Sequence, residues 1–352
     1  MVIHSYIKKI LKSKNIMRTR YLVIAALLLA CVACNKDIAV KPVTFDVTSA
    51  KNNGTASTTF STKDTVQFNF TGNPDMITFF SGEPGKNYDY RNRVSATGTP
   101  QLQFSTILAN GTQSGSLSLL VSSDFKGVAT NTIYGVLTRD TATTNANIAA
   151  ATWSDITSRA TLSTGGTTAV ASGIIDLSDF LKQGKPVYIA FKYTATAGTI
   201  QNKWTISALS VNNVLADGTS YTIANLNAPT TSFTNYGNIT YGPGWAVSYD
   251  PAKNANKYAW VYTDKTSLVI TGATTAALAT GPAEAWAIMG PIDLTKVTPD
   301  MGVAIKAISA TLSSYPYNYT TAGTYNAVFS ASNNTNSATS SVVKKVTLTI
   351  NP

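Results

Sequence analysis

The side chains that most often perform catalysis are scarce in this chain of 352 residues. It holds one histidine, His4, and two cysteines, Cys31 and Cys34, and all three lie within the first 34 residues. Without histidine or cysteine, the rest of the chain cannot build a Ser-His-Asp triad, a Cys-His dyad or a usual zinc site. The sequence therefore indicates a non-catalytic protein whose body has no disulfide.

Carboxylates offer the remaining route to catalysis. Retaining glycoside hydrolases use two carboxylates about 5 Å apart, and inverting ones use two that are about 6.5–9.5 Å apart. The sequence contains only two glutamates, Glu83 and Glu284, besides 15 aspartates, and no spacing singles out a pair. No enzyme is expected.

An apolar segment near the N-terminus has the features of an export signal. Residues 21–30 are apolar, follow Arg18 and Arg20, and are too few to cross a bilayer about 30 Å thick. The segment leads into Cys31 and Cys34, an arrangement that resembles a bacterial lipobox, in which the cysteine thiol is lipidated. The sequence therefore predicts a lipoprotein signal peptide.

Either cysteine suits lipidation, and Cys34 is favoured because it and the next three residues resemble the start of many Bacteroidota lipoproteins. The signal peptide would then span residues 1–34. A lipidated cysteine carries more than one acyl chain, which is enough for a stable anchor. Asn35, rather than an aspartate, at the second mature position suggests sorting to the outer membrane, so we expect the protein there, held by lipid at the cell surface.

The net charge of +10 does not predict a nucleic-acid partner. Six of the 27 basic residues precede the cysteines, and removing them leaves 21 against 17 acidic residues, a charge of +4. After residue 40, no run of basic residues is interleaved with aromatic ones, so no nucleic acid is expected as a partner.

Composition and periodicity predict an all-β fold. Charged residues make up 12% of the chain, about half the usual globular share. Apolar and polar residues alternate in segments such as 66–70 and 346–350, as they do in half-buried strands. One short helical turn is expected at 177–182.

Both ends of the chain resemble parts of PKD-type immunoglobulin-like domains. Residues 45–79 resemble the first strands of that fold, and the chain from Tyr319 onward resembles the last. A sandwich needs about seven strands, more than either piece supplies. After a tether over residues 35–43, we expect residues 44–98 and 300–352 to pair into one split β-sandwich.

The middle of the chain, residues 99–299, resembles a galactose-binding-like jelly roll inserted into that sandwich. The residues that carry this resemblance are 121–125, 151–156, 173–178 and 187–193. The whole chain, most distinctively residues 77–85, resembles a Bacteroidota lipoprotein family of unknown function, number 5017.

The family resemblance implies glycan binding, as an accessory of a SusC/SusD-type uptake transporter. The alternative is a structural or adhesive subunit that contacts another membrane protein of the envelope.

Two groups of aromatic residues are candidates for stacking on sugars. Tyr241 and Trp245 lie in a Gly/Pro-rich stretch, and Tyr258, Trp260 and Tyr262 alternate along one predicted strand face. For each group we favour burial over sugar binding. Trp245 would begin a core strand, and the strand face that carries Tyr258, Trp260 and Tyr262 would be buried. Three further tryptophans, Trp153, Trp204 and Trp286, are assigned to the core.

A polar, aromatic loop at residues 81–93 is a further candidate for binding. Glu83, Tyr88 and Arg91 would grip a partner there, or else the loop is structural and Glu83 bonds to Arg91 or Arg93.

Structural calcium is compatible with oxygen-rich loops around Asp124, Asp140 and Asp155, although no Asp-x-Asp-x-Asp-Gly motif occurs. No other cofactor is expected.

Overall fold

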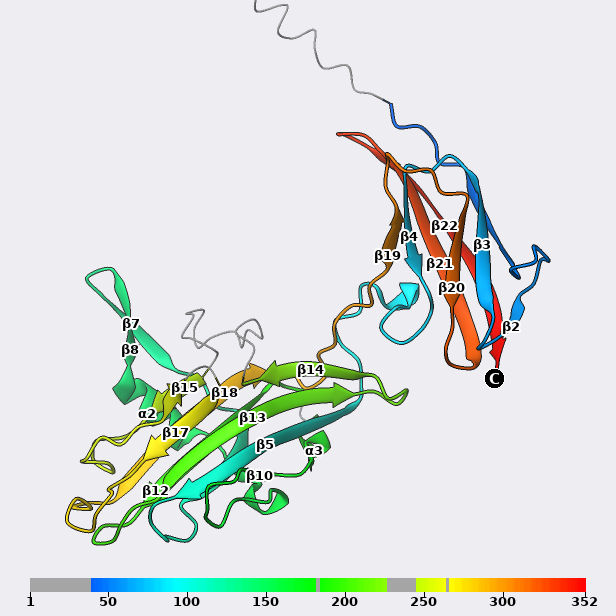
Figure 1. Ribbon diagram of the computed structural model, residues 1–352. Coiled ribbons are helices and arrows are strands. Elements are labelled where there is room, and N and C mark those ends of the chain that lie inside the picture. Colours follow the sequence, from blue (N-terminus) through cyan, green and yellow to red (C-terminus); the bar gives the residue numbers. More distant parts are fainter. Residues whose placement is uncertain (1–38, 182–183, 227–244, 264–265) are drawn as a thin grey trace, which may run out of the picture. The chain divides into compact units, whose positions relative to one another are not determined.

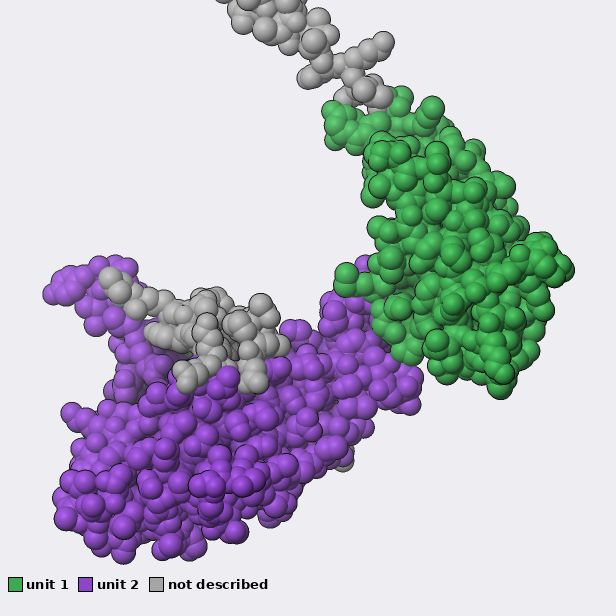
Figure 2. Space-filling view, in the orientation of Figure 1, with its two compact units in different colours: residues 1–88, 301–352 green, residues 89–300 purple. Residues whose placement is uncertain are grey.

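The computed structural model describes residues 39–181, 184–226, 245–263 and 266–352. Its sheets confirm the all-β, sandwich-like fold predicted from the sequence. The chain divides into two compact units, coloured separately in Figure 2. Unit 1 consists of Met1–Tyr88 and Met301–Pro352, and unit 2 consists of Asp89–Asp300. The first segment of unit 1 thus ends at Tyr88, whereas the sequence analysis placed this boundary at residue 98.

Unit 1 is built from two sheets. The three-stranded sheet has the order β1 (Phe45–Ala50), β3 (Thr65–Gly72), β20 (Ser314–Asn318). The five-stranded sheet has the order β19 (Val303–Lys306), β4 (Met76–Phe80), β21 (Gly323–Asn334), β22 (Thr339–Asn351), β2 (Thr59–Ser61). In both sheets, strands that precede unit 2 in the sequence pair with strands that follow it (Figure 1).

Aromatic rings dominate the core of unit 1. The strands alternate buried and exposed residues, which places Phe68, Phe79 and Phe329 between the sheets. The ring of Phe329 lies 4.9 Å, centroid to centroid, from those of Phe68 and Phe79. Tyr319 is also fully buried, and its hydroxyl donates a hydrogen bond of 2.9 Å to the carbonyl oxygen of Ser81. The burial of these rings stabilises unit 1.

Two glycines after β4 offer a matched test of backbone constraint. Gly82 and Gly85 have φ angles of +83° and +78°, but a Cβ atom at Gly82 would lie 2.7 Å from the backbone oxygen of Asn326, whereas one at Gly85 would meet nothing within 4 Å. We expect Gly85→Ala to cost about 1–2 kcal/mol and Gly82→Ala about 2–4 kcal/mol, because only Gly82→Ala adds a clash. Denaturant unfolding measures the loss of stability in each variant. Equal losses would show that the close approach of Asn326 does not constrain Gly82.

Unit 2 is a sandwich of two larger sheets. The seven-stranded sheet contains β10 (Val170–Ala171), β5 (Thr99–Ala109), β13 (Lys203–Val214), β17 (Ser267–Thr271) and β16 (Val261–Thr263) in this order, with β11 (Ile175–Asp176) on β5 and β14 (Ser220–Asn225) on β13. The five-stranded sheet has the order β15 (Trp245–Ser248), β18 (Ala283–Ile292), β12 (Val187–Ala195), β6 (Leu117–Ser122), β9 (Ser154–Asp155).

Short elements complete unit 2. They are the hairpin of β7 (Ala129–Ile133) and β8 (Val136–Asp140), the helices α2 (Thr141–Ala150) and α3 (Ser178–Leu181), and the 3₁₀ turn η2 (Thr157–Arg159). A further 3₁₀ turn, η1 (Tyr88–Tyr90), begins at the last residue of the first segment of unit 1. Across the described parts of the chain, no helix is long and apolar enough to cross a membrane.

The alternation of β12 gives the five-stranded sheet two distinct faces. Ile189, Phe191 and Tyr193 are fully buried in the core between the two sheets of unit 2. Lys192 and Thr194 alternate with them and are partly exposed on the outer face. The outer face therefore carries the polar groups of this sheet.

The incoming and outgoing segments of unit 2 are paired with each other. The backbone N–H of Val297 donates to the oxygen of Val94, and that of Asp300 donates to the oxygen of Tyr90, both at 3.1 Å. Next to these bonds, Nη2 of Arg93 lies 3.3 Å from the buried carboxylate of Asp300. Two ends that are far apart in sequence are thus fastened together within unit 2.

Candidate functional site

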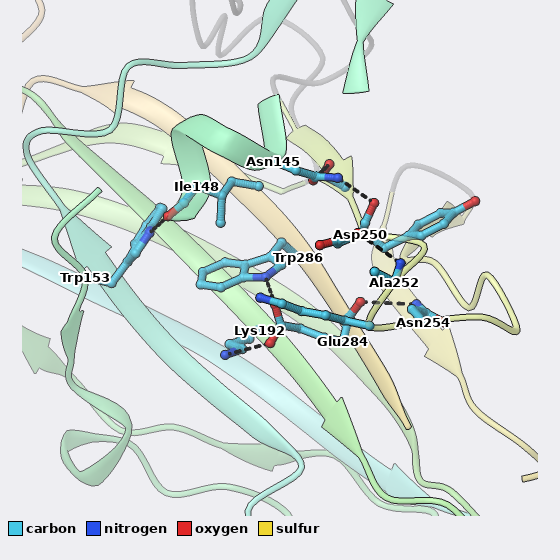
Figure 3. Close-up of polar contacts among 12 residues, drawn as sticks. Asn145, Ile148, Trp153, Lys192, Asp250, Ala252, Asn254, Glu284 and Trp286 are labelled. Carbon is cyan, nitrogen blue, oxygen red and sulfur yellow. Dashed lines mark hydrogen bonds and ion pairs between the residues drawn. The ribbon is translucent and has the colours of Figure 1, made fainter. Parts of the chain in front are cut away.

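A groove of about 740 Å³ lies on the outer face of the five-stranded sheet of unit 2. It is bordered by α2 and by the turn that follows β15, and its floor is formed by β12 and β18. Its lining includes Asn145, Trp153, Lys192, Asp250, Glu284 and Trp286 (Figure 3).

Helix α2 is held over the sheet by its capping and its spacing. The side chain of Asp140 accepts a hydrogen bond of 2.9 Å from the backbone N–H of Thr143, as a helix N-cap does. Thr144 and Ile148, four residues apart and therefore on one helix face, are buried. Ile148 packs in a small cluster with Trp286, which fixes one border of the groove.

Two tryptophans provide the aromatic part of the groove. The rings of Trp153 and Trp286 lie 5.3 Å apart at an angle of 44°. Trp286 is 8% exposed, whereas Trp153 is partly exposed and anchored by a 3.0 Å hydrogen bond from its Nε1 to the carbonyl oxygen of Ile148. Trp286 therefore supports the ring of Trp153, which is the more accessible of the two.

Glu284 is the centre of a charged network beside the tryptophans. Its Oε2 lies 3.1 Å from Nζ of Lys192, and its Oε1 accepts a hydrogen bond of 3.1 Å from Nε1 of Trp286. Nζ of Lys253 lies 3.6 Å from the same Oε1. Lys192 also lies 5.1 Å from the centroid of the Trp286 ring, within range of a cation–π interaction. Figure 3 shows that Lys192 and Glu284 lie beside the ring of Trp286.

The pKa of Glu284 is lowered. Burial raises it, but the hydrogen bonds from Trp286 and Lys192 and the charges of Lys192 and Lys253 together outweigh burial. A carboxylate with a lowered pKa stabilises the folded state above the ordinary glutamate pKa, and this contribution disappears as the pH falls through the lowered value.

We expect Glu284→Gln to reduce the stability of unit 2 at neutral pH and to have progressively less effect as the pH falls below the ordinary glutamate value. Denaturant unfolding of both proteins between pH 7 and pH 3 measures this difference. A difference that does not vary with pH would contradict the role of the ionised carboxylate.

Polar groups also line the border of the groove opposite the tryptophans. Nδ2 of Asn145 donates to the oxygen of Tyr249 at 2.9 Å, and Oδ1 of Asp250 accepts from the N–H of Ala252 at 3.0 Å. Oδ2 of Asp250 has no hydrogen bond within the described ranges. The buried Asn254 ties this turn to β18 through a 3.2 Å bond to the oxygen of Glu284. The groove thus presents an acceptor on a fixed turn.

The aromatic residues proposed from the sequence do not form this site. Trp245 and Trp260 are 5% and 2% exposed and lie in the core of unit 2, so the core alternative holds for both. Tyr258 and Tyr262 pack partly buried against the same core, and the Tyr262 hydroxyl donates to the oxygen of Leu226 at 2.6 Å. The hypothesis of an exposed platform is corrected accordingly. Tyr241 lies outside the described residues.

The residues of the 81–93 loop are divided between the units. In unit 1, Oε2 of Glu83 accepts a 2.7 Å hydrogen bond from the Ser81 hydroxyl and a short one from the Tyr317 hydroxyl. The expectation that Glu83 bonds to Arg91 or Arg93 is therefore wrong. Tyr88 stacks edge-on against Phe80 at 5.2 Å. Arg91 is exposed and belongs to unit 2. These contacts assign Glu83 and Tyr88 to the packing of unit 1.

The aspartates considered for calcium serve local structure. Asp124 accepts from the Ser122 hydroxyl at 2.7 Å and from the N–H of Thr152 at 2.8 Å, and Asp155 accepts from the N–H of Thr157 at 2.9 Å. Asp140 caps α2. Among the residues with described positions, no group of three or more His, Cys, Asp or Glu side chains could hold a metal ion.

Fold and groove together define an all-β, sandwich-like protein with an aromatic and charged surface site. The chain belongs to the family with the domain of unknown function DUF5017, which matches residues 33–233. Trp153 and Lys192 lie within the matched region, whereas Glu284 and Trp286 follow it. No curated protein matches the chain, and no solved structure does.

Sequence reasoning missed this groove. It assigned Trp153, Trp204 and Trp286 to the core because each lies in a strand pattern; Trp204 and Trp286 are indeed buried, whereas Trp153 is partly exposed. It considered Glu284 only as a possible partner of Glu83. The sequence signal was the spacing of Glu284 and Trp286, which puts both side chains on one face of a strand.

Proposed function

We propose that this protein is a non-catalytic glycan-binding lipoprotein of the outer membrane and that the groove on unit 2 is its glycan site. The observation that carries this proposal is that one groove is lined by the partly exposed ring of Trp153 and by the charged groups of Glu284 and Lys253. A sugar presents apolar C–H faces, which pack on aromatic rings, and hydroxyl groups, which pair with charged acceptors and donors. A volume of about 740 Å³ lies within the usual range of ligand sites.

The state of Glu284 supports binding rather than hydrolysis. A glycosidase acid needs a raised pKa so that it can hold a proton near neutral pH. The pKa of Glu284 is lowered, by the net effect of its hydrogen bonds and nearby lysine charges against burial. This carboxylate accepts hydrogen bonds from a sugar but is a poor proton donor.

Localisation completes the proposal. Lipidation of Cys34, anchoring to the outer membrane at the cell surface and association with a SusC/SusD-type transporter follow from the sequence pattern and the family resemblance. Both Cys31 and Cys34 lie outside the described residues. Labelling of growing cells with a palmitate analogue tests the anchor: Cys34→Ser abolishes incorporation, and Cys31→Ser does not.

A glycan array with the soluble chain from Asp37 onward, at low micromolar concentration, tests the glycan site. We expect saturable binding that Trp153→Ala weakens at least about tenfold, since loss of a central aromatic contact commonly exceeds 1.4 kcal/mol. Tyr134→Ala is the matched control, because that ring is fully exposed on the turn between β7 and β8. Unchanged affinity of Trp153→Ala would place any glycan elsewhere.

A second candidate function is a structural or adhesive subunit of the envelope. The hairpin β7–β8 projects from unit 2 (Figure 1), and Ile133 and Tyr134 at its turn are 52% and 101% exposed. Exposed apolar side chains on a projecting element are typical of contacts with another protein. A folded protein that binds no glycan but retains an outer-membrane protein, and loses it on Tyr134→Ala, would favour this function.

A further inference from the structure

We propose that the glycan site is elongated and selects a linear, uncharged oligosaccharide chain over a single sugar. The chain would extend from the groove with Trp153 along β12 into a second groove on unit 2. This inference rests on the proposed function, because it names the ligand class of the same site.

The second groove has a volume of about 460 Å³ and a different character. It is formed by the loop after β5 and by the end of β12 with the loop that follows it. Its lining consists of hydroxyl and amide side chains with one alanine and includes Thr112, Gln113, Ser114, Thr194, Thr196 and Thr199. No charged or aromatic residue of the described chain lines it.

The two grooves are lined by neighbouring positions of β12 on the outer face of the sheet. Lys192 lines the first groove and Thr194 lines the second, and these residues are successive outward positions on β12. In the register between β12 and β18, Thr194 lies opposite Glu284, and Lys192 lies opposite Trp286. Residues directly opposite each other in neighbouring strands have Cβ atoms about 4.5–5.5 Å apart. A ligand that contacts Glu284 in the first groove therefore reaches Thr194 in the second.

Hydroxyl groups in the second groove are available to a sugar. The hydroxyls of Thr112, Ser114 and Thr196 make no hydrogen bond within the described chain. Gln113, in contrast, holds the two loops together, since its Oε1 accepts from the N–H of Thr196 at 2.8 Å and its Nε2 donates to the Thr199 hydroxyl at 2.8 Å. Free hydroxyls on fixed loops suit the hydroxyls of an uncharged sugar and offer no counter-charge for an acidic one.

The two grooves therefore contribute differently. The first supplies aromatic stacking and charge-assisted hydrogen bonds, which are the stronger contacts, whereas the second supplies neutral hydrogen bonds, which are individually weaker. A short sugar binds in the first groove alone. A longer chain gains affinity from the second.

Isothermal titration with size ladders from monosaccharide to hexasaccharide tests this inference, using α-glucan, β-glucan, mannan, xylan and galactan series and the soluble chain from Asp37. We expect affinity to rise with chain length in the series that binds. The variant with Thr112→Val, Ser114→Ala and Thr196→Val should lower the affinity for the longest chain about three- to tenfold and leave that for the shortest bound sugar unchanged. Thr132→Val, an exposed position on β7, is the control.

The outcomes separate the inference from the function on which it rests. Affinity that does not vary with chain length, or equal weakening of short and long sugars by the triple variant, overturns the elongated site and leaves the glycan site in the first groove. Absence of binding by sugars of every length to the folded protein overturns both.

Discussion

Replacing Phe329 by alanine is expected to lower the free energy of unfolding of unit 1 by about 3–5 kcal/mol. Phe329 is fully buried on β21, and its ring contacts those of Phe68, Phe70 and Phe79 at centroid distances of 4.9, 5.3 and 4.9 Å. Truncation removes these contacts and leaves a cavity between two sheets that cannot close fully around it.

The distribution of tryptophan allows the effect to be assigned to one unit. All five tryptophans of the chain belong to unit 2. Denaturant unfolding followed by tryptophan fluorescence therefore reports on unit 2, whereas circular dichroism reports on both units. We expect Phe329→Ala to shift only the dichroism transition, and Val343→Ala, at a position 43% exposed, to shift neither. A matching shift in fluorescence would show that the two units unfold together.

Asp300→Ala is expected to destabilise unit 2 by about 3–5 kcal/mol. The side chain of Asp300 is 1% exposed and that of Arg93 is 19% exposed, so removal of the carboxylate leaves a largely buried guanidinium without this counter-charge. Nη2 of Arg93 also donates to the Tyr221 hydroxyl at 3.0 Å, and its guanidinium lies 3.9 Å from the ring centroid of Tyr90. These contacts hold the cation in place when its partner is lost.

A surface ion pair of unit 2 supplies the control for Asp300→Ala. Arg159 and Asp179 approach to 2.7 Å, but their side chains are 39% and 49% exposed. Since exposed pairs contribute about 0–1 kcal/mol, Asp179→Ala should change the fluorescence transition little. Comparable losses from Asp179→Ala and Asp300→Ala would show that burial does not determine the strength of the Arg93–Asp300 pair.

The class of fold was accessible from the sequence because strand periodicity is a local property. The alternation at residues 66–70 and 346–350 predicts strands, and both segments form them, as parts of β3 and β22. Helix α2 was missed. Its residues, TATTNANIAA, include threonine and asparagine, which favour other states, and their apolar pattern is weak. The Asp140 cap and the packing of Ile148 stabilise it instead.

The candidate site was harder to predict from the sequence, because it depends on which face of a sheet another element covers. Both Trp260 and Trp286 lie in apolar strand patterns, yet Trp260 is buried between the sheets, while Trp286 packs on the outer face under α2. Sequence periodicity shows that alternate residues share a face but does not show which face another element covers. The pairing of Lys192 with Glu284 depends further on the register between β12 and β18, which joins segments about ninety residues apart.

The fastening of the two ends of unit 2 has a consequence for the order of folding. Strands β2, β3 and β4 leave the ribosome long before β19 to β22, with which they pair, and the whole of unit 2 is synthesised between them. Closing a disordered chain of roughly 200 residues costs about 2–3 kcal/mol more than closing one of roughly ten. Once unit 2 has folded, the bonds from Val297 to Val94 and from Asp300 to Tyr90 make that loop short. Unit 2 would therefore act as an intramolecular folding aid, bringing the two halves of unit 1 together as the last strands emerge.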